Sequence, residues 1–553
     1  MKKIFYVFPI IILFLTGGRS YASRLHQEDG IYNNHSAEYV RTLNRNASTD
    51  GDAAFYNPAG IVFTERTGLY VMFSSQTYYK KRLHSMDYTG LNVEGYTTGF
   101  QHTLSSQGGF LTNRATGGID GSNSYYAEVT APILPDLCVA YHGNTKGHEW
   151  ATYLHVGVMQ AAPDFTYPKG LAIVDWGNLA VAETLYYLSG ATDPIASYMY
   201  EVNTAVRTEY FVGATIGAAY KIVEWLSAGL GLRYIYATGA QSITVKNPYF
   251  TTANHTPFET NLNNDTSVGM SDWKINTEYS GHGFGIITSI DFRPVDKLFI
   301  AFRHEYYAPM NATKKTNKFM APTNIEGSGQ LDIFKDGSGN TMEDGRVYYG
   351  ARGSKKLILT YPQSLSFGLS YNIIKQLRFE VSGDMYFRPY VKMNKNYKVV
   401  DYILGGPVAV PVYESSNRED DFNIGYRVGG CLEYAPIECW KISVGYAYND
   451  PGIKKSARSE VDPLLTSHTI GLGFGFVAND RLAISVGGYY CIFNPETIKS
   501  VVKTVSPSDT VVYHAIEKEL GEKIFSIGIG ITYRFLGSDT ASTKVKKDEK
   551  TDL

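Results

Sequence analysis

The sequence predicts an all-β chain, a transmembrane antiparallel β-barrel of about 14 strands with an N-terminal plug in its lumen. Three observations predict this fold. Apolar and small residues alternate along many segments, the N-terminus carries an export signal, and short turns alternate with long polar loops. The 553 residues are enough for one large barrel or for several ordinary domains.

The alternation is clearest near the C-terminus. Residues 525–535 place Phe, Ile or Tyr at every second position, with Ser, Gly, Thr and Arg between them. One face is wholly apolar with aromatic residues at both ends, which is typical of a strand that crosses a bilayer between two interfacial girdles. The other face is small rather than charged, which favours a crowded lumen. A large soluble β protein is the alternative.

The connections between strands support the barrel. Short turns are expected near 144–148, 223–224, 294–296, 374–375, 436–438 and 479–480. Long polar loops are expected at 81–123, 162–205, 241–272, 311–360, 391–418, 451–465 and 495–521. The expected strands lie near 67–80, 124–143, 149–161, 206–222, 225–240, 273–293, 297–310, 361–374, 376–390, 419–435, 439–450, 466–478, 481–494 and 522–535. Short turns on one side and long loops on the other are typical of an outer-membrane barrel with its turns in the periplasm.

The chain divides into four predicted parts. Residues 1–22 have a basic start, an apolar run and the small-residue site Ser20-Tyr21-Ala22, which together predict a secretory signal peptide. Residues 23–66 are expected to form the plug, with a short helix at 37–43, and residues 67–536 the barrel with long extracellular loops. Residues 537–553 are polar and charged and are expected to form a disordered periplasmic tail. An exported barrel belongs in the outer membrane of a Gram-negative bacterium.

Composition narrows the function. The formal net charge of −2 gives no case for nucleic-acid binding. The four cysteines do not form a disulfide framework in a chain of this length, no Cys/His group has zinc-finger spacing, and isolated packed thiols are expected. No nucleophile–base constellation emerges, and histidines such as His155 and His304 need no catalytic role. We therefore expect no enzyme, no cofactor and no metal, and we expect a monomer that meets outer-membrane lipids and the barrel-assembly machinery.

Several segments resemble a known family. Residues 50–60, with Asn57-Pro58-Ala59, resemble the hatch motif of the FadL/TodX (OMPP1) family of outer-membrane transporters of hydrophobic compounds. Segments within 212–234, 283–298, 361–369 and 445–451 resemble its later hairpins. The resemblance implies a barrel plugged by an N-terminal hatch, uptake of long-chain fatty acids or other hydrophobic molecules, and sideways exit at a kinked third strand. The long loops and the polar tail after Phe535 depart from the family pattern.

Two site predictions concern the hatch and the wall. Asn57, Pro58 and Ala59 are expected to form a rigid hatch turn, because proline fixes its own φ and restricts the preceding residue; an ordinary turn is the alternative. Gly157 is expected to mark a bulge and Pro163 an end of pairing, so both are candidates for a lateral gate. A normal strand that ends in a loop is the alternative there.

The third prediction concerns a substrate carboxylate. By parity with their neighbours, Arg233, Arg303 and Arg427 face the lumen, and a guanidinium is the natural partner of a carboxylate. Pairing of these arginines with lumenal Glu305 or Glu433 is the alternative.

The last prediction concerns capture at the surface. Loop residues with aromatic or apolar side chains are candidates for a capture surface: Tyr186, Tyr187, Leu188, Tyr198 and Met199. The first functional hypothesis is therefore uptake by loop capture, hatch rearrangement and lateral diffusion through the wall. A structural or adhesive surface barrel that binds host or matrix components, and a general polar porin, are the alternatives.

Overall fold

The computed structural model describes most of the barrel and the segment inside it. The described residues are 33–93, 124–167, 195–199, 202–246, 249–252, 273–320, 353–391, 393–394, 398–403, 406–410, 415–416, 421–458, 463–505 and 511–535. No helix in these ranges is long and apolar enough to cross a membrane.

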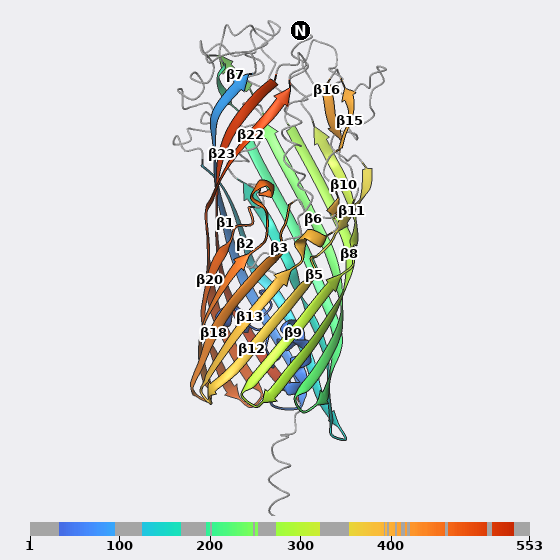
Figure 1. Ribbon diagram of the computed structural model, residues 1–553, viewed down its shortest axis with the longest axis vertical. Helices are drawn as coiled ribbons and strands as arrows, with labels where there is room; N and C mark the ends of the chain where they lie inside the picture. Colours follow the sequence, from blue (N-terminus) through green and yellow to red (C-terminus); the bar gives the residue numbers. More distant parts are fainter. Residues whose placement is uncertain are drawn as a thin grey trace, which may run out of the picture.

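One antiparallel sheet closes on itself into a barrel of fourteen strands (Figure 1). The uninterrupted strands are β1 (Gly68–Val93), β2 (Ser124–Thr145), β3 (His148–Tyr167), β5 (Val202–Val223), β6 (Leu226–Lys246), β8 (Trp273–Val295), β13 (Leu377–Tyr386), β18 (Gly425–Ile437), β19 (Trp440–Asp450), β20 (Ser467–Asn479) and β23 (Val511–Phe535). Three more are interrupted: β9 and β10 (Leu298–Tyr307, Met310–Met320), β11 and β12 (Gly353–Leu359, Ser364–Ile374), and β21 and β22 (Leu482–Phe493, Glu496–Val505). The first and last strands close the barrel, with Leu69 opposite Phe535.

The short turns all lie at one end of the barrel, as predicted (Figure 1). The described parts of the long connections contain three small ribbons and two short helices. These are β4 (Ile195–Met199) with β7 (Tyr249–Thr252), β14 (Met393–Asn394) with β17 (Ser415–Ser416), β15 (Lys398–Ile403) with β16 (Gly406–Val410), η4 (Arg388–Tyr390) and η5 (Lys455–Ala457). Strands β7, β15 and β16 lie at the end opposite the turns (Figure 1).

The outer face carries the apolar side chains. On β19, Ile442 and Val444 are exposed between Trp440 near the turn and Tyr446 farther up. An apolar band between two aromatic rows is the pattern of a lipid-facing barrel wall. The four cysteines carry free thiols, and three of them are buried, so the expectation of packed thiols is confirmed.

Several strands run well beyond their predicted ends. β1 continues to Val93, β6 to Lys246, and β23 begins at Val511, where polar loops were predicted. Two strands are shorter than predicted. Strand β18 begins at Gly425 instead of residue 419, and β13 ends at Tyr386 instead of residue 390. Above the apolar band, the outer face no longer needs apolar residues, so the period of two disappears from the sequence while the hydrogen-bond ladder continues.

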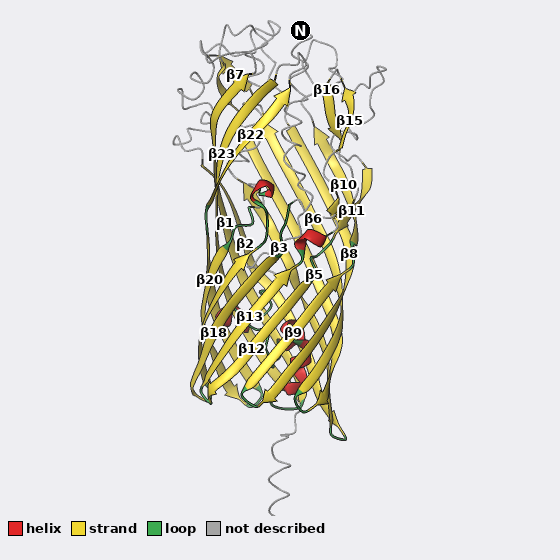
Figure 2. Ribbon diagram, viewed as in Figure 1, coloured by secondary structure: helices red, strands yellow, loops and turns green. Residues whose placement is uncertain are grey.

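Residues 33–64, here called the inner segment, lie inside the barrel near the end with the short turns (Figure 2). The segment contains α3 (Ala37–Thr42), α4 (Ala53–Tyr56) and η2 (Pro58–Phe63). Helix α3 confirms the short helix predicted at 37–43. It begins because the Ser36 hydroxyl accepts a hydrogen bond from the Tyr39 backbone N–H at 2.9 Å, and it ends because Leu43 takes a left-handed conformation with φ of 58°.

A buried ion pair organises the inner segment. The Arg45 guanidinium donates to both carboxylate oxygens of Asp52, at 2.8 and 2.7 Å, and both side chains are fully buried. The hydroxyls of Ser36 and Ser48 donate to the same carboxylate at 3.0 and 2.6 Å. Bidentate pairing with further hydrogen bonds satisfies a charge that burial would otherwise penalise. The Asp52 carboxylate thus joins the start of α3, the turn at residue 48 and the start of α4.

Glycines on the lumenal face of the wall let the inner segment approach the strands. A Cβ at Gly445 would lie 1.9 Å from the Thr42 carbonyl oxygen, and one at Gly487 would lie 2.7 Å from the Arg41 backbone nitrogen. Gly528 similarly leaves room for Val40, since a Cβ there would lie 2.8 Å from Cγ2 of that side chain. The small lumenal residues that predicted a crowded lumen are therefore the places where the segment packs.

This packing predicts a difference between two glycines of the same wall. Gly445→Ala should lower the free energy of unfolding by about 1–3 kcal/mol, because its new methyl group overlaps the backbone of Thr42. Gly475→Ala is the matched control, since its Cβ would come no closer to another residue than 3.4 Å, the distance to Lys441 Cβ. Urea unfolding of both variants, followed by the heat-dependent gel shift of the barrel, measures the difference. Equal stability of the two variants would contradict close packing at Gly445.

Candidate functional site

The predicted hatch motif is anchored to the wall. The Asn57 side-chain amide donates to Asp291 Oδ2 at 2.8 Å and to the Ser48 carbonyl at 3.0 Å. Ala59 accepts a hydrogen bond from Ser227 Oγ through its carbonyl, at 2.8 Å. Pro58 occupies the first turn of η2, where its missing N–H removes no helical hydrogen bond. The motif thus ties η2 to strands β6 and β8.

Arg233 and Arg303, two of the predicted carboxylate ligands, lie buried in the lumen. Arg303 Nη1 donates to the Phe55 carbonyl at 2.5 Å, and its Nε lies 3.5 Å from Glu305. Arg233 Nη1 lies 3.2 Å from the same Glu305 carboxylate and donates to the Tyr307 hydroxyl at 2.5 Å. Both guanidinium groups lie over the Phe55 ring. Both arginines therefore pair with Glu305 in the lumen, as the alternative to binding a substrate carboxylate predicted.

Arg427, the third candidate, also faces the lumen. It pairs with Asp384 at 3.3 Å and donates to the Leu43 carbonyl of the inner segment. Glu433, the partner considered from sequence, instead pairs with Arg41 of α3 and lies 3.6 Å from Lys441. Arg303 and Arg427 thus bind carbonyl oxygens of the inner segment. Whether any of the three arginines binds a substrate stays a prediction.

The barrel wall has a break between β2 and β3. The two strands pair from Thr145 opposite His148 up to Asp136 opposite Gly157, and the next pair joins Glu128 to Thr166. Residues 129–135 of β2 and 158–165 of β3 make no pair with each other. In the lower part of the described wall the other neighbouring strands stay paired, so the ladder that a membrane wall normally provides is interrupted at this break.

Prolines and bulges accompany the break. Pro132 and Pro135 remove two backbone donors from β2, and Pro132 with Ile133 forms a bulge opposite Thr77 of β1. On β3, pairing with β5 shifts at Met159, and again between Ala162 and Phe165. The bulge is therefore not at Gly157, which was expected to carry it and is paired on both sides.

The two predicted gate residues nevertheless mark this part of the wall. Gly157 is the last paired residue below the break, and Pro163 lies within it. Their role in a gate stays a prediction. The prolines of β2 are the sequence signal that was missed, since a predicted strand at 124–143 contains both.

The inner edges of the break are mainly apolar. Its lumen-facing residues are buried and come from both strands: Val129, Ala131 and Leu134 of β2, and Met159 and Ala161 of β3. Gln160 is polar and donates a hydrogen bond to Glu209 of β5. The outward side chain of Ile133 is 67% exposed. Apolar residues thus stand on both sides of a stretch of wall that lacks pairing.

Three buried polar side chains meet just below the break. Asp136 Oδ2 lies 2.6 Å from His35 Nδ1 of the inner segment and 3.0 Å from His155 Nε2 of β3. Burial lowers the pKa of His35 despite the opposing effect of the Asp136 carboxylate, so its ring is neutral at neutral pH. A Cβ at Gly157 would lie 2.0 Å from Asp136 Oδ2. Sequence reasoning missed this group because its members are far apart in the chain.

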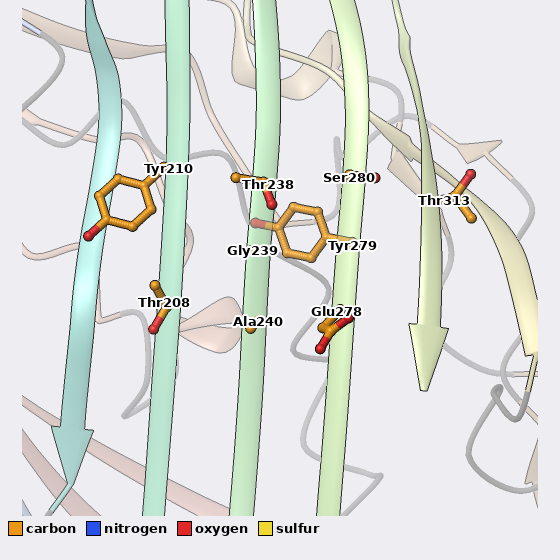
Figure 3. A pocket seen from close by; sticks show the side chains of 9 residues that line it. All are labelled: Thr208, Tyr210, Thr238, Gly239, Ala240, Glu278, Tyr279, Ser280 and Thr313. Atoms are coloured by element: carbon orange, nitrogen blue, oxygen red, sulfur yellow. The ribbon is translucent and has the colours of Figure 1, made fainter. Parts of the chain in front are cut away.

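An open pocket of about 460 Å³ lies farther up the wall over β5, β6, β8 and β10 (Figure 3). It is lined by Thr208, Tyr210, Thr238, Gly239, Ala240, Glu278, Tyr279, Ser280 and Thr313. Six of these residues carry a hydroxyl group and one carries a carboxylate.

The predicted capture surface falls largely outside the described part of the chain. Tyr186, Tyr187 and Leu188 lie outside the described residues, whereas Tyr198 and Met199 belong to β4, which pairs with β7. Their role in capture stays a prediction.

One solved structure supports the fold. A Pseudomonas aeruginosa FadL homologue is similar over 91% of this chain and 98% of its own, with a TM-score of 0.56 and 14% identity. The toluene transporter TodX of Pseudomonas putida gives 88% and 94% coverage, a TM-score of 0.44 and 10% identity. The Ralstonia pickettii toluene transporter TbuX is similar over 88% of this chain and 94% of its own, with a TM-score of 0.42 and 11% identity. At 14% identity, the similarity to the FadL homologue shows the fold alone. No curated protein sequence matches the chain significantly.

The sequence profile of one family matches more than half of the chain. Residues 196–535 match the family described as outer membrane protein transport protein (OMPP1/FadL/TodX). This match agrees with the closed barrel and its apolar outer band. The chain belongs to the OMPP1/FadL/TodX family of outer membrane transport proteins, and it is an outer-membrane β-barrel.

Proposed function

We propose that the protein takes up hydrophobic small molecules, long-chain fatty acids or hydrocarbons, across the outer membrane. The extracellular loops capture the molecule, the inner segment rearranges, and the molecule leaves sideways into the bilayer. The break between β2 and β3 carries this proposal, because apolar lumen-facing residues border this unpaired stretch of the wall.

Burial energetics favour a sideways exit for such a molecule. Each CH₂ group that leaves water contributes about 0.8 kcal/mol, so a long acyl chain is more stable in the bilayer than in the periplasm. An exit between Val129 and Ala131 on one side and Met159 on the other keeps the chain in apolar surroundings. A route straight through the lumen would instead expose it to water.

The inner segment supports a plugged transporter rather than an open polar porin. Its residues 33–48 and 51–63 are buried, and its elements pack against strands on several sides of the lumen. Arg303 and Arg427 bind its Phe55 and Leu43 carbonyls. A substrate carboxylate that competes for either arginine would displace one of these carbonyls. Ligand binding and rearrangement of the inner segment would then be coupled.

Deleting residues 23–60 tests the plug. The barrel should still assemble, because the deletion removes no barrel strand, and it should conduct small ions because the lumen loses its filling. Single-channel recording in planar bilayers measures the conductance, with heat modifiability as the assembly check. Deletion of residues 23–32 alone is the control, since it keeps every contact described above. Currents of the longer deletion no larger than those of the control would rule out a plugging role.

A bulky label at the break tests the exit. We expect Ile133→Cys, once modified with a bulky maleimide in the folded protein, to take up labelled fatty acid several-fold more slowly than before modification. The label would stand on the lipid side of the unpaired stretch. Labelling after folding separates obstruction from misassembly. Cys439→Ser in the same chain removes the one native cysteine that is not buried.

The matched control for this label is Ile216→Cys. Ile216 is 66% exposed on the outer face, close to the 67% of Ile133, but it lies in β5, which is paired on both sides. Its modification should leave uptake unchanged. If the two labels slow uptake equally, or if neither does, the exit does not lie between β2 and β3.

Arg303→Gln tests carboxylate recognition. We expect the dissociation constant of a fatty acid to rise about 10-fold to 100-fold, since a hydrogen bond to a charged group contributes about 1.5–3 kcal/mol. The alcohol of the same chain length is the control ligand, because it lacks the carboxylate. Any effect of the substitution on the inner segment would alter the binding of acid and alcohol alike. Tryptophan-fluorescence titration of detergent-solubilised protein measures both. Equal losses for acid and alcohol would assign Arg303 to holding the inner segment only.

A further inference from the structure

We propose that His35, Asp136 and His155 form a binding site for one transition-metal ion, with Zn²⁺ as the best fit. The three side chains come from the inner segment, β2 and β3, and all are buried. Their ligating atoms lie within 4.8 Å of one another. A metal bound there would join the inner segment to the wall at the lower border of the break.

The donor set matches zinc chemistry. Two imidazole nitrogens and one carboxylate oxygen are the ligands of many zinc sites, and oxygen-preferring Mg²⁺ and Ca²⁺ rarely use imidazole. Zinc bonds of about 2.0–2.1 Å put tetrahedral ligands roughly 3.3 Å apart. Here Asp136 Oδ2 lies 2.6 Å from His35 Nδ1 and 3.0 Å from His155 Nε2. Side-chain shifts of under about 1 Å would therefore open a coordination site.

The charge balance also points to a cation. Five buried lumenal carboxylates of the described wall pair with Arg or Lys, namely Glu305 with Arg233, Glu380 with Arg378, Asp384 with Arg427, Glu433 with Arg41 and Glu522 with Lys80, whereas Asp291 accepts a hydrogen bond from the Asn57 amide. Asp136 instead contacts the rings of two histidines, His35 and His155. Arg233, a nearby guanidinium, already pairs with Glu305. A divalent ion would supply the positive charge that this carboxylate lacks.

Two neighbouring residues suit such a site. Gly157 leaves room for it, because a Cβ there would lie 3.0 Å from His35 Nδ1 and 2.0 Å from Asp136 Oδ2. Cys138 faces the same space, with its Sγ 3.8 Å from Asp136 Oδ1, and it stands opposite His155 in the ladder. A thiolate is a further zinc ligand, so Cys138 is a candidate for a fourth position, although its Sγ lies outside the group of ligating atoms within 4.8 Å of one another.

Zinc binding to the mature, folded chain in detergent tests the proposal without any transport assay. We expect one Zn²⁺ per chain by isothermal titration and by metal analysis after dialysis, with no comparable binding of Mg²⁺. Asp136→Asn and His155→Gln should each raise the Zn²⁺ dissociation constant by more than about 100-fold. Loss of a residue that only hydrogen-bonds a metal ligand typically raises it by about 10-fold to 100-fold. Only heat-modifiable, assembled protein is titrated.

His142→Gln is the matched control. His142 is also a buried histidine of β2 that contacts the inner segment, with Nδ1 2.7 Å from Thr64 Oγ1, but it lies outside the cluster. It should bind zinc like the unaltered protein. The absence of stoichiometric zinc binding, or equal binding by all variants, would overturn the proposal. The three side chains would then only hold the inner segment by hydrogen bonds.

Discussion

A barrel wall in lipid must pair its backbone N–H and C=O groups within the sheet, and the rest of this structure depends on that constraint. Closure of β1 on β23 satisfies it at the seam, and ladders between neighbouring strands satisfy it elsewhere. The unpaired stretch between β2 and β3 is therefore costly. It persists because Pro132 and Pro135 have no backbone donors to pair, and because bulges on both strands turn the edges out of register. Because such costly local features cluster at functional sites, we expect the unpaired stretch between β2 and β3 to have a function.

The lumen has the opposite requirement, since a folded polypeptide segment fills it. Backbone groups of this segment need partners, and the wall supplies them as charged and hydroxyl side chains. Arg303 and Arg427 donate to carbonyls of residues 55 and 43, while Ser289 accepts from the backbone N–H of Ala59. Glycines such as Gly445 provide the space. Polar contacts of this kind can exchange for ligand or water. The segment also packs against the wall through an apolar cluster in which Phe63 and Ile61 lie with Phe299.

Strands β2 and β3 bring the main features of the proposed site together. The break begins directly above Gly157, and the Asp136 group lies directly below it. His35 is the member of this group that belongs to the inner segment, and the Phe55 ring packs against both His35 and His155. A change in the inner segment would therefore reach the lower border of the break through a few direct contacts.

The sequence by itself determined the barrel, because lipid on one side and a crowded lumen on the other impose a period of two that residues 525–535 display. It also indicated the six short turns, the short helix α3 and the lumenal orientation of Arg233. Strand ends beyond the apolar band escaped prediction, since ladders there continue without any apolar pattern. Only the tertiary structure decided which groups meet across the lumen. Asp384 rather than Glu433 pairs with Arg427, and His35 meets His155, because barrel closure and the path of the inner segment set distances that no local spacing encodes.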